Sequence, residues 1–116
     1  MDNNQYKIIE NALKQFDEVE YIYISNLYKD NKKIINCNIV CAIDNIIEND
    51  KLLKGIIANI EIIKSLFERA NINFNYSIKC LDTFKDEMED IDSDTYQEYY
   101  ISNIIYTKNH EVKKYC

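Results

Sequence analysis

Residues 34–44 read Ile-Ile-Asn-Cys-Asn-Ile-Val-Cys-Ala-Ile-Asp, and the alternation in this stretch constrains the fold more than any other feature. Its odd-numbered positions are all apolar, whereas its even-numbered positions are polar early and apolar late. The odd positions are Ile35, Cys37, Ile39, Cys41 and Ile43, and the even positions include Asn36, Asn38, Val40 and Ala42. Because successive side chains of a strand point to opposite faces, we expect a central strand. One face is buried along its whole length, and the other is polar at its start and covered at its end.

The spacing of apolar residues elsewhere predicts two long helices and three further strands. Apolar residues recurring every three or four positions indicate a helix, and alternation or β-branched and aromatic clusters indicate a strand. The first expected helix is 4–16, and its apolar stripe is Tyr6, Ile9, Leu13 and Phe16. The second is 50–70, capped by Asn49, and its apolar stripe is Leu53, Ile56, Ile60, Ile63 and Phe67. The expected strands are 19–28, 72–81 and 104–107. A polar turn at 29–32 joins the first two strands into an antiparallel hairpin.

The chain holds one glycine and no proline, so other residues must make its turns. Asn, Asp and Ser tolerate left-handed backbone and form local side-chain hydrogen bonds, and we expect them at these places. The single glycine, Gly55, falls inside the second helix, where it costs about 1 kcal/mol relative to Ala. Two interpretations are open: tolerated drift, or the close approach of another backbone.

These elements indicate an α/β fold of the two-layer α+β type. Their order is α-β-β-α-β, followed by short acidic helices that begin at Thr83 and Asp94 and by the last strand. The one-sided polar patterns of the strands place both long helices on one face of the sheet. A chain of 116 residues fits one domain, which we assign to 1–109, with a polar C-terminal tail at 110–116.

The expected cellular compartment follows from the absence of targeting and membrane-spanning patterns in the sequence. Its start is polar, without a basic region and apolar run of a signal peptide. No apolar stretch reaches the roughly 20 residues that span a bilayer. Two of the four cysteines, Cys37 and Cys41, would lie about 13 Å apart on one strand face, too far for a disulfide. We therefore expect a soluble cytoplasmic protein with reduced cysteines and no membrane partner.

The strongest functional feature is an acidic segment at 82–98. It contains eight acids and one base, a net charge of −7, whereas the whole chain carries −6 and the remainder therefore about +1. Tyrosines, which are enriched at interfaces, lie in and beside it. We expect these residues to contact a partner: Asp86, Glu87, Glu89, Asp90, Asp92, Asp94, Tyr96, Glu98 and Tyr99. Because concentrated negative charge speeds association with a basic surface, the expected partner is a basic protein, for example a nuclease-type toxin.

No residue pattern predicts a catalytic, cofactor-binding or metal site. The single histidine, His110, falls in the polar tail, without the fixed partner that nucleophilic catalysis needs. The acids at 90, 92 and 94 have the spacing of the first three ligands of an EF-hand loop, but Thr95 and Ile101 stand where that loop requires Gly and Glu. A single glycine excludes a Gly-rich phosphate loop. The acidic balance opposes nucleic-acid binding.

In the order of its elements the chain resembles a minimal nucleotidyltransferase core. In that family a Gly-Ser ends the first strand and an Asp-x-Asp on the second binds magnesium for nucleotide transfer. Here Ser25-Asn26 stands in place of Gly-Ser, and Asn36-Cys37-Asn38 in place of Asp-x-Asp. Neutral Asn carbonyls cannot replace the carboxylates of two-metal chemistry. The same order resembles ribosome-binding KH-like factors, which are basic and carry a Gly- or Ala-centred turn.

Three functions remain open at this point. The first is a non-enzymatic protein-binding module, such as a toxin-neutralising immunity or antitoxin protein. The second is a degenerate nucleotidyltransferase-like domain that binds a nucleotide on its polar sheet face, through Asn36, Asn38, Asp44, Asn73 and Ser77. The third is a structural subunit that forms a homodimer through its open sheet face or edge strand.

Overall fold

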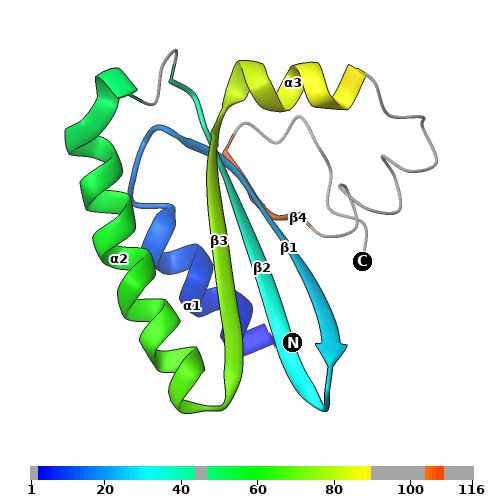
Figure 1. The fold of residues 1–116 in the computed structure, drawn as a ribbon. Helices are drawn as coiled ribbons and strands as arrows, with labels where there is room; N and C mark the ends of the chain where they lie inside the picture. Colours follow the sequence, from blue (N-terminus) through cyan, green and yellow to red (C-terminus); the bar gives the residue numbers. More distant parts are fainter. Residues whose placement is uncertain (1–2, 44–46, 90–103, 109–116) are drawn as a thin grey trace.

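The computed structural model describes residues 3–43, 47–89 and 104–108, which form a sheet with helices (Figure 1). The elements, in chain order, are α1 (Asn3–Leu13), β1 (Val19–Lys29), β2 (Lys32–Cys41), the 3₁₀ turn η1 (Ile47–Asn49), α2 (Asp50–Arg69), β3 (Ile72–Cys80), α3 (Leu81–Glu89) and β4 (Ile104–Thr107). The predicted strands and long helices are all present, including the short last strand. The two-layer α+β prediction is thereby confirmed.

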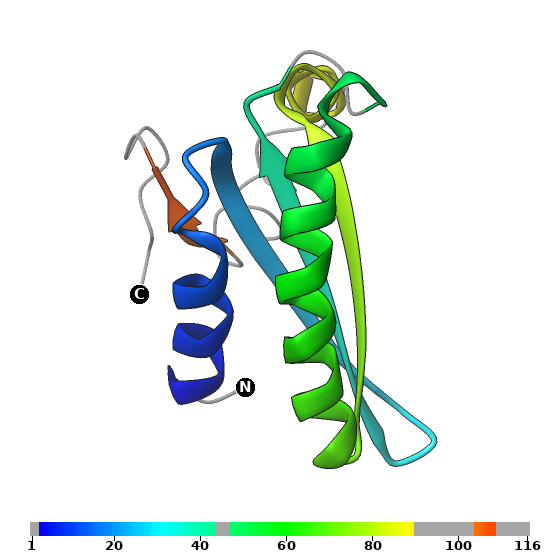
Figure 2. The ribbon, with the colours of Figure 1, turned by 90° about the vertical axis from the view of Figure 1, so that its left-hand side faces the viewer.

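The sheet has the strand order β3-β2-β1-β4. β1 and β2 form the expected antiparallel hairpin, β4 pairs antiparallel with the other side of β1, and β3 runs parallel to β2. The parallel pair is joined through α2, as a parallel connection requires a crossover. Figure 2 shows α1 and α2 on the same face of the sheet, which confirms their predicted placement.

Left-handed backbone occurs at the turns, and on the residue types expected there. The β1–β2 hairpin turns through Asp30 (φ 54°) and Asn31 (φ 63°), and the α2–β3 turn passes through Asn71 (φ 62°). Two successive residues with positive φ fit the two-residue hairpin loop whose twist matches that of the strands. Asp and Asn thus do the work that glycine does in other chains.

The core lies between the sheet and the two long helices. Ile35, Cys37, Ile39 and Cys41 of β2 are all buried there, as their alternation predicts. From α2 come Ile56, Ile60, Ile63 and Phe67, whereas Leu53 at the start of the predicted stripe is only half-buried. The rings of Phe67 and Phe74 stack with centroids 5.2 Å apart. At roughly 1.5–3 kcal/mol for each fully buried side chain, this cluster is the main source of stability.

Among the described residues, α3 covers the opposite face of the sheet at one end (Figure 1). Phe84 of α3 is buried, and its ring lies 5.3 Å from that of Tyr21 and 5.8 Å from that of Tyr23, centroid to centroid. Val40, the apolar even-numbered position late in β2, is fully buried beneath them. The expected change of that strand face from polar to covered is therefore confirmed at Val40, whereas Ala42, just beyond the end of β2, is exposed.

Four details of the helices differ from expectation. α1 ends at Leu13, so Phe16 lies beyond it. Asn49 precedes α2 but its side chain makes no capping hydrogen bond, because η1 leads directly into the helix. α3 begins at Leu81, before the predicted cap Thr83, because β3 continues into it without a loop. The neighbour of Gly55 is the Phe16 ring, 3.4 Å from where a Cβ would stand, and no backbone of another described element comes within 4 Å of that position.

Within the part of the chain that the structure describes, no helix is long and apolar enough to cross a bilayer. The described cysteines, Cys37, Cys41 and Cys80, are free thiols, as expected.

Candidate functional site

The predicted acidic contact residues fall at and beyond α3. Asp86 is exposed on α3, and Glu87 and Glu89 belong to the same helix. The others lie outside the described residues: Asp90, Asp92, Asp94, Tyr96, Glu98 and Tyr99. The second acidic helix expected at Asp94, His110 and the tail at 110–116 lie outside them as well.

α3 fixes the beginning of the acidic segment on the folded sheet. Phe84 anchors the helix against Tyr21 and Tyr23 of β1. Asp82 and Asp86 are exposed and four positions apart, so they lie on one side of the helix, away from the anchoring ring. The acids at the start of the segment are therefore held at defined positions on the molecule.

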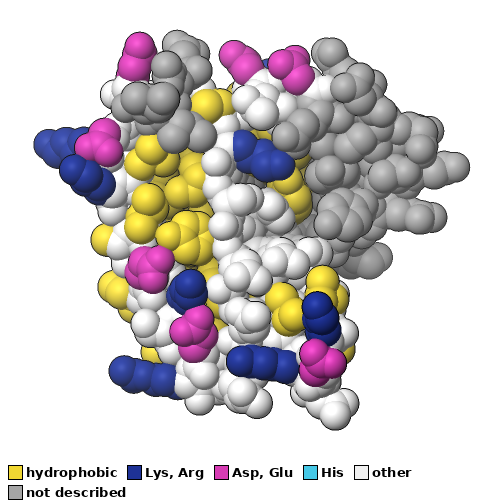
Figure 3. All heavy atoms as spheres, viewed as in Figure 1, with side chains coloured by type: hydrophobic (Ala, Val, Ile, Leu, Met, Phe, Trp, Pro, Cys, Tyr) yellow, Lys and Arg dark blue, Asp and Glu magenta, His cyan; other side chains and the backbone are white. Residues whose placement is uncertain are grey.

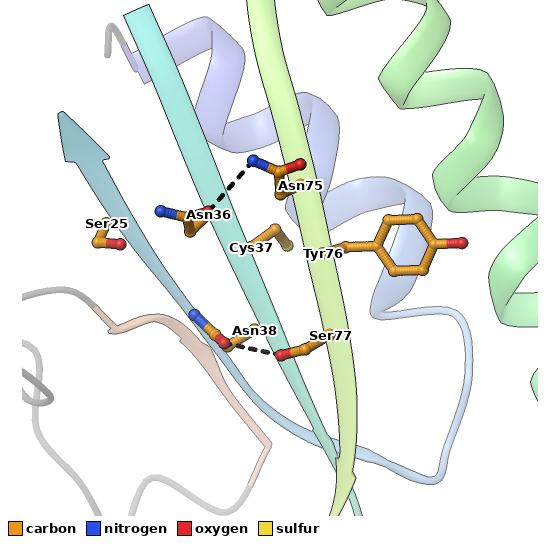
Figure 4. A pocket seen from close by; sticks show the side chains of 7 residues that line it. All are labelled: Ser25, Asn36, Cys37, Asn38, Asn75, Tyr76 and Ser77. Atoms are coloured by element: carbon orange, nitrogen blue, oxygen red, sulfur yellow. Dashed lines mark hydrogen bonds between the residues drawn. The ribbon is translucent and has the colours of Figure 1, made fainter. Parts of the chain in front are cut away.

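A second candidate site is a polar hollow of about 270 Å³ on the open sheet face (Figure 4). It is lined by Ser25, Asn36, Cys37, Asn38, Asn75, Tyr76 and Ser77, from three adjacent strands. The register brings them together, because Asn36 pairs with both Ser25 of β1 and Asn75 of β3, and Asn38 pairs with Ser77. Side chains at paired positions point to the same face.

Two side-chain hydrogen bonds hold the amides of this hollow in place. Ser77 Oγ donates to Asn38 Oδ1 at 2.8 Å, and Asn75 Nδ2 donates to Asn36 Oδ1 at 3.5 Å (Figure 4). Because the amide oxygens of Asn36 and Asn38 accept these bonds, their NH₂ groups are left facing the opening as donors. The chemistry offered is a small array of neutral amides and hydroxyls.

Cys37 and Tyr76 line the hollow with backbone, since their side chains belong to the other face. The Cys37 thiol is buried in the core, and burial raises its pKa to about 12. Tyr76 Oη donates to Glu61 Oε1 of α2 at 2.9 Å. Burial, and then the hydrogen bond to Glu61, raise the pKa of Tyr76 above its usual value. The side chains that do point into the hollow belong to Ser and Asn residues, and none of them is ionisable.

The sequence predicted some of the residues that line this hollow, but not all of them. Asn36, Asn38 and Ser77 line it as expected, whereas Asn73 does not, and Asp44 lies outside the described residues. Ser25 and Asn75 complete it, and the strand register is what brings them there. The pair Ser25-Asn26 is split between faces, because Asn26 Nδ2 donates to Tyr6 Oη of α1 at 3.5 Å.

The register also places two thiols next to each other, a pairing that spacing along the chain does not reveal. Cys41 of β2 is the register partner of Cys80 of β3. Burial, and then the charges of Glu18 and Cys80, raise the pKa of Cys41 to about 12. Protonated thiols are weak nucleophiles, so Cys41 is not activated for nucleophilic chemistry. Among residues 3–43, 47–89 and 104–108, no group of three His, Cys, Asp or Glu side chains could hold a metal ion.

Comparison with known proteins assigns the chain to no family. No protein-family model matches it, and no curated protein matches its sequence. The nucleotidyltransferase resemblance therefore stays a prediction that depends on element order, with Asn36 and Asn38 where that family has carboxylates.

Proposed function

We propose that this protein is a non-enzymatic, cytoplasmic binding module whose acidic segment at 82–98 covers a basic surface of a partner protein. The class that fits best is an immunity or antitoxin protein, which occupies the basic, phosphate-binding site of a nuclease-type toxin. The observation that carries the proposal is the separation of charge. The segment holds a net charge of −7, and the remaining residues sum to about +1.

The attachment of α3 to the sheet supports this proposal. Phe84 is only 4 % exposed, so the first turn of the segment is already ordered. It therefore loses less conformational entropy when a partner binds than a free tail would. Asp82 and Asp86 meet solvent beside it. A fixed array of like charges on one flank gives both fast association and selection against acidic partners.

The proposal is tested with the basic product of a reading frame adjacent to the gene as the candidate partner, by titration calorimetry at low and high salt. The variant Asp90→Asn/Asp92→Asn/Asp94→Asn removes three of the charges. We expect its Kd to rise by about tenfold to hundredfold, and the wild-type Kd to rise steeply with salt.

A matched control makes the same change in charge elsewhere. Asp17→Asn/Asp30→Asn/Glu48→Gln alters three exposed acids outside the segment, and we expect its Kd to stay within a factor of about two. Binding that ignores salt, or that responds equally to both variants, would rule out the acidic segment as the interface.

The neutral hollow supports a second candidate, a nucleotide-binding domain without transferase activity. Three amides and two hydroxyls converge there without a carboxylate, which suits the hydrogen-bonding edge of a base more than a metal-bound triphosphate. Thermal unfolding with Mg-ATP and Mg-GTP tests it. A raised Tm that is lost in Asn38→Ala but kept in the exposed control Asn4→Ala is expected, and an unchanged Tm with both nucleotides eliminates this candidate.

A further inference from the structure

β3 is an edge strand that carries few of the usual devices against pairing. Within the described residues it pairs with β2 alone, over nine residue pairs without a shift in register. The chain has no proline to interrupt it, and Lys79 is its only charged side chain. Such an edge presents a row of backbone donors and acceptors that another strand can extend.

The sequence of β3 is self-complementary about its centre, Tyr76. Its apolar positions face the helices and its polar positions face the open side. The apolar positions are Ile72, Phe74, Tyr76, Ile78 and Cys80, and the polar positions are Asn73, Asn75, Ser77 and Lys79. An antiparallel copy centred on Tyr76 would therefore pair all nine residues and match apolar with apolar and polar with polar at every pair, whereas a slip by one residue would mismatch every pair.

The flank of α2 beside β3 is also complementary to itself. The hydrogen bond from Tyr76 identifies Glu61 as a member of that flank. Residues three, four and seven positions from Glu61 share its side of the helix: Lys54, Ile57, Lys64 and Glu68. Under a two-fold axis near Glu61 and Tyr76, Lys54 of one copy approaches Glu68 of the other. Lys54 Nζ also lies 3.0 Å from Asp50 Oδ2 of its own helix, so it would bridge the two carboxylates. The Lys64 stem covers Ile57, which is 37 % exposed.

The described elements leave this edge of the sheet unpaired. Figure 2 shows α2 lying over the β2–β3 side of the sheet, with β3 at its border. Figure 3 shows hydrophobic side chains where α2 and β3 lie next to each other. α3 leaves the end of β3 across the opposite face, toward Tyr21 and Tyr23 of β1 (Figure 1). The acidic segment therefore starts at one end of the edge strand, and α3 carries it away from that edge.

We propose that β3 pairs antiparallel with β3 of a second copy of this chain, about a two-fold axis at Tyr76, to form a homodimer with one continuous sheet. A second copy fits this edge better than an unrelated strand, because the alternation of β3 matches under this axis and two Lys54–Glu68 pairs flank it. These two pairs lie on either side of the Glu61 carboxylates, which face each other near the axis and which each accept a hydrogen bond from Tyr76 Oη.

The dimer is tested by charge exchange on α2, with the Kd of self-association measured by sedimentation at several concentrations. Lys54→Glu and Glu68→Lys each place like charges together twice in the dimer, so we expect each to raise the Kd by about tenfold. The double variant Lys54→Glu/Glu68→Lys restores opposite charges and should return the Kd to near the wild-type value. Lys7→Glu, the same change on α1, is the matched control and should leave the Kd unchanged.

Hydrogen exchange gives an independent readout that needs no variant. Raising the protein concentration should slow the exchange of amides in 72–80 and leave those in 104–107 unaffected. A wild-type chain that stays monomeric at every concentration overturns the proposal. A dimer that ignores both charge changes but is lost in Ile62→Glu or Leu66→Glu, on the exposed apolar side of α2, also overturns it.

Discussion

At the scale of single residues, Cys37 shows how β2 carries polar side chains on one face and buried apolar ones on the other. It lies between Asn36 and Asn38 of the hollow, yet its thiol is 1 % exposed, on the core side of β2. Burial raises the pKa of Cys37 from 9.0 to about 12, and that of Cys41 similarly. The free energy of unfolding should therefore depend on pH in the alkaline range, through these two thiols.

The sign of that link follows from the direction of the shift. The unfolded thiols lose their protons above about pH 9, whereas the folded thiols keep them until about pH 12. Their contribution to stability is complete below pH 9 and is lost as the pH rises through this window. We expect each thiol to lower the free energy of unfolding by about 1 kcal/mol per pH unit there. The raised pKa of Tyr76 acts in the same direction.

Urea unfolding at about pH 8 and about pH 10 measures this loss. Cys37→Ala should be less stable than wild type by about 1 kcal/mol at the lower pH, and its stability should fall less between the two. Equal losses in both proteins would mean that the Cys37 thiol does not titrate as its burial implies.

At the scale of elements, Phe84 is the buried side chain among residues 81–86 of α3. Replacing Phe84 by Ala removes the contacts with Tyr21 and Tyr23 and leaves a cavity over Val40, which costs about 3 kcal/mol. Because the core on the other face is untouched, amide exchange should accelerate in α3 and much less in β2. Hydrogen exchange and urea unfolding measure the two effects.

Lys85→Ala, an exposed neighbour on the same helix, should change stability by less than about 0.5 kcal/mol. If Phe84→Ala proves equally mild, α3 has another anchor. If the acidic segment binds a partner as proposed, Phe84→Ala should also weaken that binding, whereas Lys85→Ala should not.

Element patterns were also what the sequence predicted best. The alternation in β2 and β3 and the stripes of the long helices have the period of the structure they form, so local sequence suffices. The start of α3 was missed because β3 passes from Cys80 directly into Leu81, whereas the capping pattern at Thr83 assumes an intervening loop. The two interpretations of Gly55 could not be separated from the sequence, because its neighbour, Phe16, lies far from it along the chain.

At the scale of the whole molecule, the hollow depended on pairings that sequence does not encode locally. Asn36 and Asn38 could be placed on an open face from alternation alone. That Ser25 stands on one side of Asn36 and Asn75 on the other follows from two separate registers, one antiparallel and one parallel. The same holds for Cys41 and Cys80, which are 39 positions apart and adjacent in the sheet.

The unbroken passage from β3 into α3 has a mechanical consequence. If a partner binds the acidic segment as proposed, its pull reaches β3 at Cys80 without an intervening linker and reaches β1 through Phe84. The part of that force directed along β3 loads the nine pairs between β2 and β3 together, in shear, instead of opening them one after another. Within the described residues, this load would fall on the parallel ladder that joins β3 to the rest of the sheet.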